Sequence, residues 1–301
     1  MANSLSAFVP EVWAREGIEI LREKLVMAAL VHRDFSNEVA NFGDTVNTRK
    51  PGKFSANTKG ATSDVTIQDV TATNVQVVLN QHKEVSFMIY DIEASKSFQA
   101  LVDIYLDPAM LAIANAIDTA LFGLYTDITT NITILSTDTW YDTAVNAKVQ
   151  LNTQLAPRDE RRHMVVSDTD EGAILKTDEL VRWDATGVGG EDSSPILTGK
   201  IGKLAGFMLY SGTNVPSVGS PTVRKNLAFH KNAFALVSRP LATAVDETPG
   251  AMQFVANDPD TGIALRVTMS YNATKLATQV TVDVLYGVKT LDANLAVRID
   301  V

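Results

Sequence analysis

The feature that most constrains the fold is a long helical pattern of apolar residues between residues 92 and 128. The apolar positions recur every three or four residues: Phe98, Leu101, Val102, Tyr105, Met110, Ile113, Ala114, Ile117, Leu121, Leu124 and Tyr125. Asp107 followed by Pro108 is typical of a helix start, with an N-cap and a proline in the first turn. We therefore expect two helical stretches that meet at Asp107 and form one long spine, whose apolar stripe is core and not a cofactor site.

The remaining composition is that of a folded chain without cysteine chemistry. Of the 301 residues, 46% are hydrophobic and 20% are charged, which is enough for a real core in one to three domains. The absence of cysteine excludes disulfides and thiolate metal sites. The sequence predicts neither a membrane span nor a signal peptide. The formal net charge of -9 argues against gripping nucleic acid as the main task, because such proteins carry a basic face.

The N-terminal segment predicts an amphipathic helix over residues 10–31. Pro10 suits a first helical turn, and Trp13 and Leu21 fall near one apolar face. Arg22 lies among the polar positions. A helix this polar must lie against another surface, which can be the core of its own chain or a second subunit, so Trp13 and Arg22 are candidate inter-subunit contacts.

Residues 43–90 predict a long β-hairpin with a basic tip. Partial alternation of β-branched and polar residues between 65 and 90 is typical of half-buried strands. The polar, turn-rich stretch 49–60 holds Arg49, Lys50, Lys53 and Lys59 and no acidic residue. This basic tip is either a solvated loop or a loop that docks on an acidic neighbour, where opposite charges fix the register. The four basic residues are therefore also candidate inter-subunit contacts.

Residues 130–240 predict a compact α+β domain, and the chain after Gly250 predicts strands with turns. We expect a helix in "DTWYDTAVNAKVQLNTQLAP", a buried strand in "RRHMVVS" and a helix that begins near Asp168. "KNLAFHKNAFALVSRPL" predicts a strand followed by a helix.

A glycine-rich stretch, "LTGKIGKLAGFMLYSGTNVP" (197–216), invites comparison with phosphate-binding loops. A Walker loop needs the order G-x-x-x-x-G-K-[ST] before a helix, and the dinucleotide fingerprint needs G-x-G-x-x-G. Gly199, Gly202 and Gly206 fit neither order, and an apolar, strand-like run follows them. We expect turns that lead into a strand.

No catalytic or metal signature is present in the sequence. The four histidines, His32, His82, His163 and His230, lie in separate segments without ligand spacing. The acidic stretches "SDTDEG" and "NDPDTG" lack the frame of a calcium loop and are expected to be Asx-rich turns. We expect no enzyme activity and no cofactor.

The order of these parts resembles the major capsid proteins of tailed bacteriophages, which have the Hong Kong 97 fold. The stretches 197–216, "NLAFHKNAFALVSRPL" and "VDVLYGVKTLDANLAVRI" are similar to segments of the coat proteins of short-tailed phages. The resemblance covers nearly the whole chain. It implies an N-terminal arm (1–42), an extended β-hairpin loop (43–92), a peripheral domain with a spine helix (93–128), an axial domain (129–245) and peripheral strands (246–301).

The resemblance further implies a structural protein that self-assembles from pentamers and hexamers into an icosahedral head around double-stranded DNA. It implies assembly in the host cytoplasm, residence in the virion, a portal protein, a separate scaffolding protein and a possible decoration protein. The negative net charge predicts weak contact with the packaged DNA, because few phosphates would be neutralised. Two alternatives stay open at this point: an encapsulin-type compartment with the same fold, and a soluble α+β enzyme with an unrecognised carboxylate site.

Overall fold

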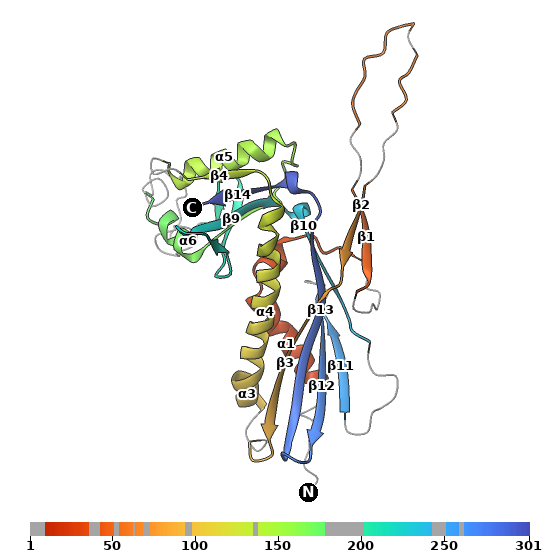
Figure 1. Ribbon diagram of the computed structural model, residues 1–301, viewed down its shortest axis with the longest axis vertical. Coiled ribbons are helices and arrows are strands. Elements are labelled where there is room, and N and C mark those ends of the chain that lie inside the picture. The colour runs from red at the N-terminus through yellow and green to blue at the C-terminus, as the bar shows by residue number, and fades with distance from the viewer. Residues whose placement is uncertain are drawn as a thin grey trace.

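The structure is a computed structural model. It describes residues 10–35, 43–50, 54–62, 64–68, 73–93, 98–134, 138–177, 202–242, 251–258 and 262–301. The body consists of an elongated sheet-and-helix layer and a compact domain at one end of it (Figure 1). A thin loop projects away from this body beyond strands β1 and β2 (Figure 1).

The elongated layer is built on a five-stranded antiparallel sheet. Its strands are β3 (Gln81–Tyr90), β13 (Ala277–Thr290), β12 (Ala264–Asn272), β11 (Ala251–Asn257) and β10 (Phe234–Arg239). The long strand β13 pairs with β3 along one edge, and with β12 and then β10 along the other. Its alternate residues Val280, Val282, Val284 and Tyr286 are fully buried in the main core. This period of two places one face of the sheet against helices.

The spine is one continuous helical rod, as the apolar pattern predicts. It consists of α3 (Phe98–Leu101), a π-helical turn (Val102–Leu106), α4 (Asp107–Phe122) and a 3₁₀ turn (Gly123–Asp127). The prediction that Asp107 caps a helix start is wrong, because the rod runs through this position and the Asp107 N–H donates to the Val102 carbonyl, five residues back. Pro108 lacks an N–H, and the wider π turn lies directly before it.

The described rod Val102–Asp127 is long and apolar enough to cross a membrane by length and composition alone. In the structure, however, its apolar side is used within the protein. Met110, Ile113, Ile117 and Leu121 are buried in the main core with residues of the sheet and of α1. Such burial is what a core helix of a folded domain requires.

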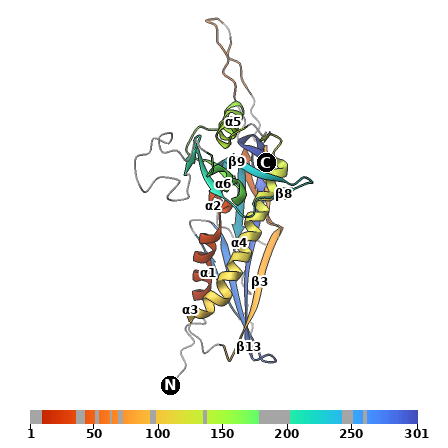
Figure 2. The ribbon, with the colours of Figure 1, turned by 90° about the vertical axis from the view of Figure 1, so that its left-hand side faces the viewer.

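The N-terminal segment forms two helices, α1 (Pro10–Lys24) and α2 (Met27–Leu30), and not the single helix expected over 10–31. Figure 2 shows α1 beside α4, and α1 also contacts β11 and β12. Gly17 permits this approach, because a Cβ there would lie 3.1 Å from the Leu265 Cδ2 and 3.3 Å from the Met110 Sδ. The arm therefore packs on the core of its own chain.

The expected hairpin is present but shorter than 43–90. β1 (Thr45–Lys50) pairs antiparallel with β2 (Thr73–Val78), from Thr45 opposite Val78 to Lys50 opposite Thr73. The following strand, β3, leaves the hairpin and pairs with β13 in the five-stranded sheet. The hairpin therefore projects from the layer, while β3 anchors its C-terminal end in the layer.

The compact domain is an α+β unit around a mixed sheet. The sheet runs in the order β4 (Asn131–Thr133), β14 (Ala296–Asp300), β9 (Val223–His230), β5 (Arg162–Val166), β7 (Phe207–Ser211) and β6 (Lys203–Leu204), with β8 (Ser217–Val218) paired to β9. The expected helices are α5 (Trp140–Thr153) and α6 (Asp168–Ile174). On β5, Met164 and Val166 pack with these helices, whereas Val165 faces the main core. Burial on both faces explains why this strand reads as a continuous apolar run.

Two strands pair with the sheet of the other region, so the sheets do not follow the expected domain limits. β10 lies within 129–245 but pairs with β13 of the elongated layer, and β14 lies within 246–301 but pairs with β4 and β9 of the compact domain. The helix expected at the end of "KNLAFHKNAFALVSRPL" is strand β10. All six residues of β10 are buried, and a short run buried on both faces has the same composition in a strand as in a helix.

Candidate assembly surfaces

The projecting loop, residues 54–62 and 64–68, exposes large apolar side chains. Phe54 is 73% exposed, Val65 69% and Ile67 87%. The two sides of the loop are joined where the Ser55 N–H donates to the Gln68 Oε1 at 2.9 Å and the Gln68 Nε2 donates to the Ser55 carbonyl at 2.5 Å. Exposed apolar residues on a thin projection are a candidate interaction surface, because the described part of the chain leaves them uncovered.

The basic candidates of this hairpin are described only in part. Lys59 lies on the projecting loop and is exposed, and its Nζ donates to the Gly60 carbonyl at 3.3 Å. Arg49 and Lys50 lie on β1, but their side chains, like the whole of Lys53, lie outside the described parts of the chain. The structure therefore places Arg49 and Lys50 on β1 and Lys59 on the projecting loop, and the docking role of these residues stays a prediction.

The base of the hairpin packs directly on the sheet. Val77 and Leu79 are fully buried and cluster with Ala235, Val237 and Leu285 of β10 and β13. The close approach depends on Gly287 in β13, because a Cβ there would lie 2.3 Å from the Val78 carbonyl oxygen. Sequence reasoning missed this position, although a glycine inside a strand pattern is the expected sign of close backbone approach.

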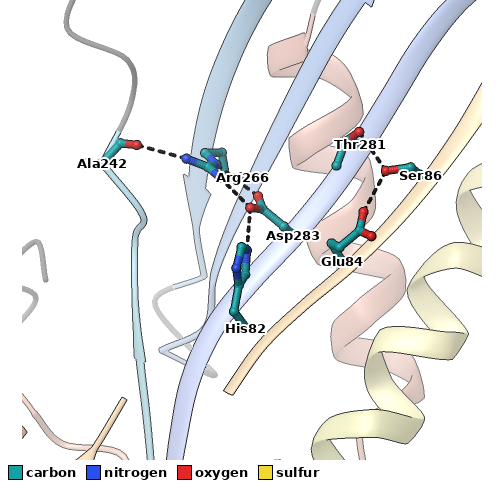
Figure 3. A network of polar contacts seen from close by, with 7 residues as sticks. All are labelled: His82, Glu84, Ser86, Ala242, Arg266, Thr281 and Asp283. Atoms are coloured by element: carbon teal, nitrogen blue, oxygen red, sulfur yellow. Dashed lines mark hydrogen bonds and ion pairs between the residues drawn. The ribbon is translucent and has the colours of Figure 1, made fainter. Parts of the chain in front are cut away.

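Next to the hairpin base, a polar network joins three strands of the sheet (Figure 3). Arg266 of β12 binds Asp283 of β13 through two bonds, Nε to Oδ1 at 3.0 Å and Nη2 to Oδ2 at 2.5 Å, and the His82 Nε2 of β3 lies 2.8 Å from the same Oδ2. The Arg266 Nη1 also donates to the Ala242 carbonyl at 2.9 Å. Asp283 is 4% exposed, so these partners are needed to stabilise its negative charge in a buried environment.

Replacing Asp283 with alanine should lower the free energy of unfolding by about 3 kcal/mol, because the largely buried guanidinium of Arg266 would lose its carboxylate. Urea unfolding of the purified chain measures this loss. Glu84→Ala is the matched control on β3, since Glu84 is exposed and bonds only to the Ser86 hydroxyl among the contacts described for it. We expect a change within about 0.5 kcal/mol there. Equal losses in the two variants would contradict a structural role for the network.

The two arm candidates differ in where their side chains lie. The Trp13 ring is 0% exposed and lies 6.0 Å, centroid to centroid, from the Phe87 ring in the main core. It is not accessible to a second subunit, so we leave Trp13 out of the proposed contacts. Arg22 lies on the exposed side of α1.

The described residues contain no group of three or more His, Asp or Glu side chains that could hold a metal ion. His82 belongs to the network above, and the His230 Nε2 lies 3.0 Å from the Asp159 Oδ1. His163 lies on the adjacent strand β5, beside Tyr210 and Phe229. Burial lowers the pKa of His163, which disfavours its charged form.

The acidic stretch at 167–172 is the start of helix α6. The Ser167 hydroxyl accepts the Asp170 N–H and donates to the Asp170 Oδ2 at 2.7 Å. Asp170 also accepts from Arg224 at 2.7 Å and from Asn226 at 2.8 Å. Burial alone would raise the pKa of Asp170, but these hydrogen bonds together lower it below its usual value. Its oxygens are thus occupied by the protein's own donors, which argues against a calcium site.

The glycine-rich stretch turns the chain into a strand, as expected for its described part. Gly202 and Gly206 have φ values of 67° and 93°, a region that other residues rarely adopt. β7 (Phe207–Ser211) follows directly and pairs with β5. Gly199 lies outside the described residues.

Comparisons with known proteins give a fold. No protein-family model and no curated protein matches the sequence. A solved structure from Mycobacterium phage Che8 aligns over 91% of this chain and 90% of its own, with 19% identity and a TM-score of 0.63. The capsid structure of Cyanophage P-SCSP1u aligns over 91% and 87%, with 13% identity and a TM-score of 0.62. A virus-like particle from Pyrococcus furiosus aligns over 96% and 98%, with 8% identity and a TM-score of 0.54.

The chain combines an elongated sheet-and-spine layer, a compact end domain and a projecting hairpin. The fold is that of the phage capsid proteins, the Hong Kong 97 type. The fold expected from the sequence is thereby confirmed.

Proposed function

We propose that the chain is the major capsid protein of a tailed bacteriophage, a structural subunit that self-assembles into an icosahedral head. The observation that carries this proposal is the projecting loop, whose apolar residues Phe54, Val65 and Ile67 are exposed on a chain with a capsid fold. A second copy that covers this loop would bury the exposed apolar area. The four basic residues of the hairpin, Arg49, Lys50, Lys53 and Lys59, and Arg22 on the arm are the proposed inter-subunit contacts.

A shell is a physically consistent use of such a subunit. Each copy makes several modest contacts, and an extended projection raises the total area that each neighbour buries. A closed shell of pentamers and hexamers leaves no interface open. A small open oligomer would leave the interface of this loop exposed. The subunit is then a structural protein without catalytic residues, cofactor or metal.

The proposed content of the shell is double-stranded DNA. A subunit with a formal net charge of -9 would neutralise few phosphates, so the wall would contact the packaged DNA weakly. Assembly in the host cytoplasm with a separate scaffolding protein, a portal protein and optional decoration protein belongs to the same proposal, which places the subunit finally in the virion.

The second candidate is a compartment shell with the same fold that holds cargo proteins. The similarity to a virus-like particle from Pyrococcus furiosus favours it, although the identity is only 8%. The content of the particle separates the two candidates. Nuclease-protected double-stranded DNA in particles from the native source supports the phage head, and protein cargo without DNA supports the compartment.

Electron microscopy and size-exclusion chromatography of the purified full chain, with and without a co-expressed scaffolding protein, test the shell itself. We expect closed particles of uniform diameter that elute near the void volume. A stable small oligomer under both conditions, with turnover of a substrate, would overturn the assignment in favour of a soluble enzyme.

A further inference from the structure

A buried carboxylate of the spine helix holds the junction between the two arm helices, which we call the arm elbow (Leu25 and Val26). The N–H of Val26 donates to the Asp118 Oδ2 at 3.0 Å. The N–H groups of Met27 and Ala28 donate to Oδ1 at 3.1 and 3.3 Å. Asp118 lies on α4, 92 positions from Val26, and is only 3% exposed. One side chain of the spine thus accepts three backbone N–H groups at the arm elbow and the start of α2.

The charge of Asp118 has no cationic partner among the contacts described for it. Four charged or titratable groups on the elements around it have other partners: Lys24 with Asp107, His32 with Asp34, Arg33 with the Ala29 carbonyl and Tyr286 with the Ala116 carbonyl. Arg22 and Glu23 are on the exposed side of α1. Three backbone N–H groups alone offset the cost of burying this carboxylate.

We propose that Asp118 is a proton-sensitive latch, which holds the arm elbow to the spine helix more tightly in mildly acidic solution than at neutral pH. Ionisation places a charge in the core that only backbone N–H groups stabilise among the contacts described for it, and that charge is better solvated when the elbow opens and water reaches the carboxylate. Protonation removes this cost, while one carboxyl oxygen still accepts the N–H groups of Met27 and Ala28.

The direction of the effect follows from the titration of this group. Burial raises the pKa of Asp118 from 3.8 to about 6, although the hydrogen bonds from Val26, Ala28 and Met27 lower it. In the opened elbow the carboxyl is hydrated and its pKa returns toward 3.8. The closed elbow therefore binds the proton more tightly than the open one. Its advantage is fully present below about pH 4 and is lost as the pH rises through about 6.

Hydrogen exchange of the full chain at the Val26, Met27 and Ala28 amides tests the latch. After correction for the intrinsic exchange rate, we expect protection to fall by up to about 100-fold between pH 4 and pH 7.5, with most of the fall between pH 4 and pH 6. Amides of β5 and β9 in the compact domain report general unfolding and should not follow this curve. Unchanged wild-type protection at the three amides across this range would overturn the proposal.

Two variants separate the latch from other acid effects. Asp118→Asn keeps a carbonyl acceptor without a charge, so its three amides should lose the pH response. Glu19→Gln makes the same charge change at an exposed position of α1, and the three amides of this variant should keep the pH response of the wild type. A pH response in Asp118→Asn equal to that of the wild type would also overturn the latch. If this variant does not fold, the exchange curve of the wild type is by itself the test of the proposal.

The consequence for assembly rests on the proposed function, and it is measured separately. A looser elbow at neutral pH would free α1 to contact a neighbouring subunit in the shell. Sedimentation of particles at pH 5 and pH 7.5 reports assembly, whereas the exchange rates report the latch in free and assembled chains alike. A pH response at the elbow without particles would contradict only the shell.

Discussion

Replacing Gly287 with alanine should separate the hairpin from the sheet and abolish shell formation. A Cβ at this position would lie 2.3 Å from the Val78 carbonyl oxygen and 2.9 Å from the Val78 carbonyl carbon. Both are backbone atoms, so no side-chain rotation can relieve the overlap. Either β13 or the end of β2 must shift, and the buried residues Val77 and Leu79 would lose part of their packing.

We expect the free energy of unfolding of Gly287→Ala to fall by about 3 kcal/mol, which is the upper range for forcing a methyl group into packed structure. Urea unfolding measures this loss, and electron microscopy measures the yield of particles. The shift of β2 relative to β13 would also change the orientation of the projecting loop. The yield of particles should therefore fall even under conditions in which the chain stays folded.

Gly172→Ala is the matched control for this substitution. Gly172 lies inside α6, and a Cβ there would meet nothing within 4 Å. Alanine is preferred to glycine inside a helix, so this variant should be more stable by roughly 0.5–1 kcal/mol. Similar stability and particle yield for the two variants would show that Gly287 is not needed for the approach of β2 to β13.

The parts of the fold that the sequence predicts are those with a local signature. The apolar spacing of the spine predicts a rod that the structure confirms, and the alternation after Gly250 predicts strands that are present. The sheet that a strand joins is not determined by its local sequence. β10 and β14 carry no mark that assigns each to the sheet of the other domain, because pairing is decided by partners far away in the chain.

In the candidate surfaces, too, the sequence predicts the local features and not those that depend on residues far away in the chain. The basic, turn-rich composition of residues 49–60 predicts a projection, and the structure has one there. Trp13 cannot be assigned from sequence, since a tryptophan on an amphipathic helix suits an interface as well as a core, and here Phe87 of the same chain packs on it. Gly287 and Asp118 derive their roles from Val78 and from the arm elbow, neither of which lies near them in the sequence.

Reversing the charges of Arg49, Lys50 and Lys53 to glutamate should stop assembly while the subunit still folds. The three changes alter the formal net charge by -6, from -9 to -15. Because the hairpin projects from the sheet, we expect the melting temperature to stay within a few degrees of wild type. If the hairpin docks on an acidic surface of a neighbour, each contact becomes repulsive, and the yield of particles should fall roughly ten-fold or more.

A second triple variant separates the hairpin from the net charge. Arg158, Lys275 and Lys289 are exposed and lie outside the hairpin, and their reversal to glutamate gives the same formal charge of -15. This variant should assemble far better than the first. The hairpin variant should also recover part of its particle yield at high salt, because screening weakens repulsion between exposed charges. Equal yields from the two variants at low salt would assign the effect to net charge and would contradict docking through the basic hairpin.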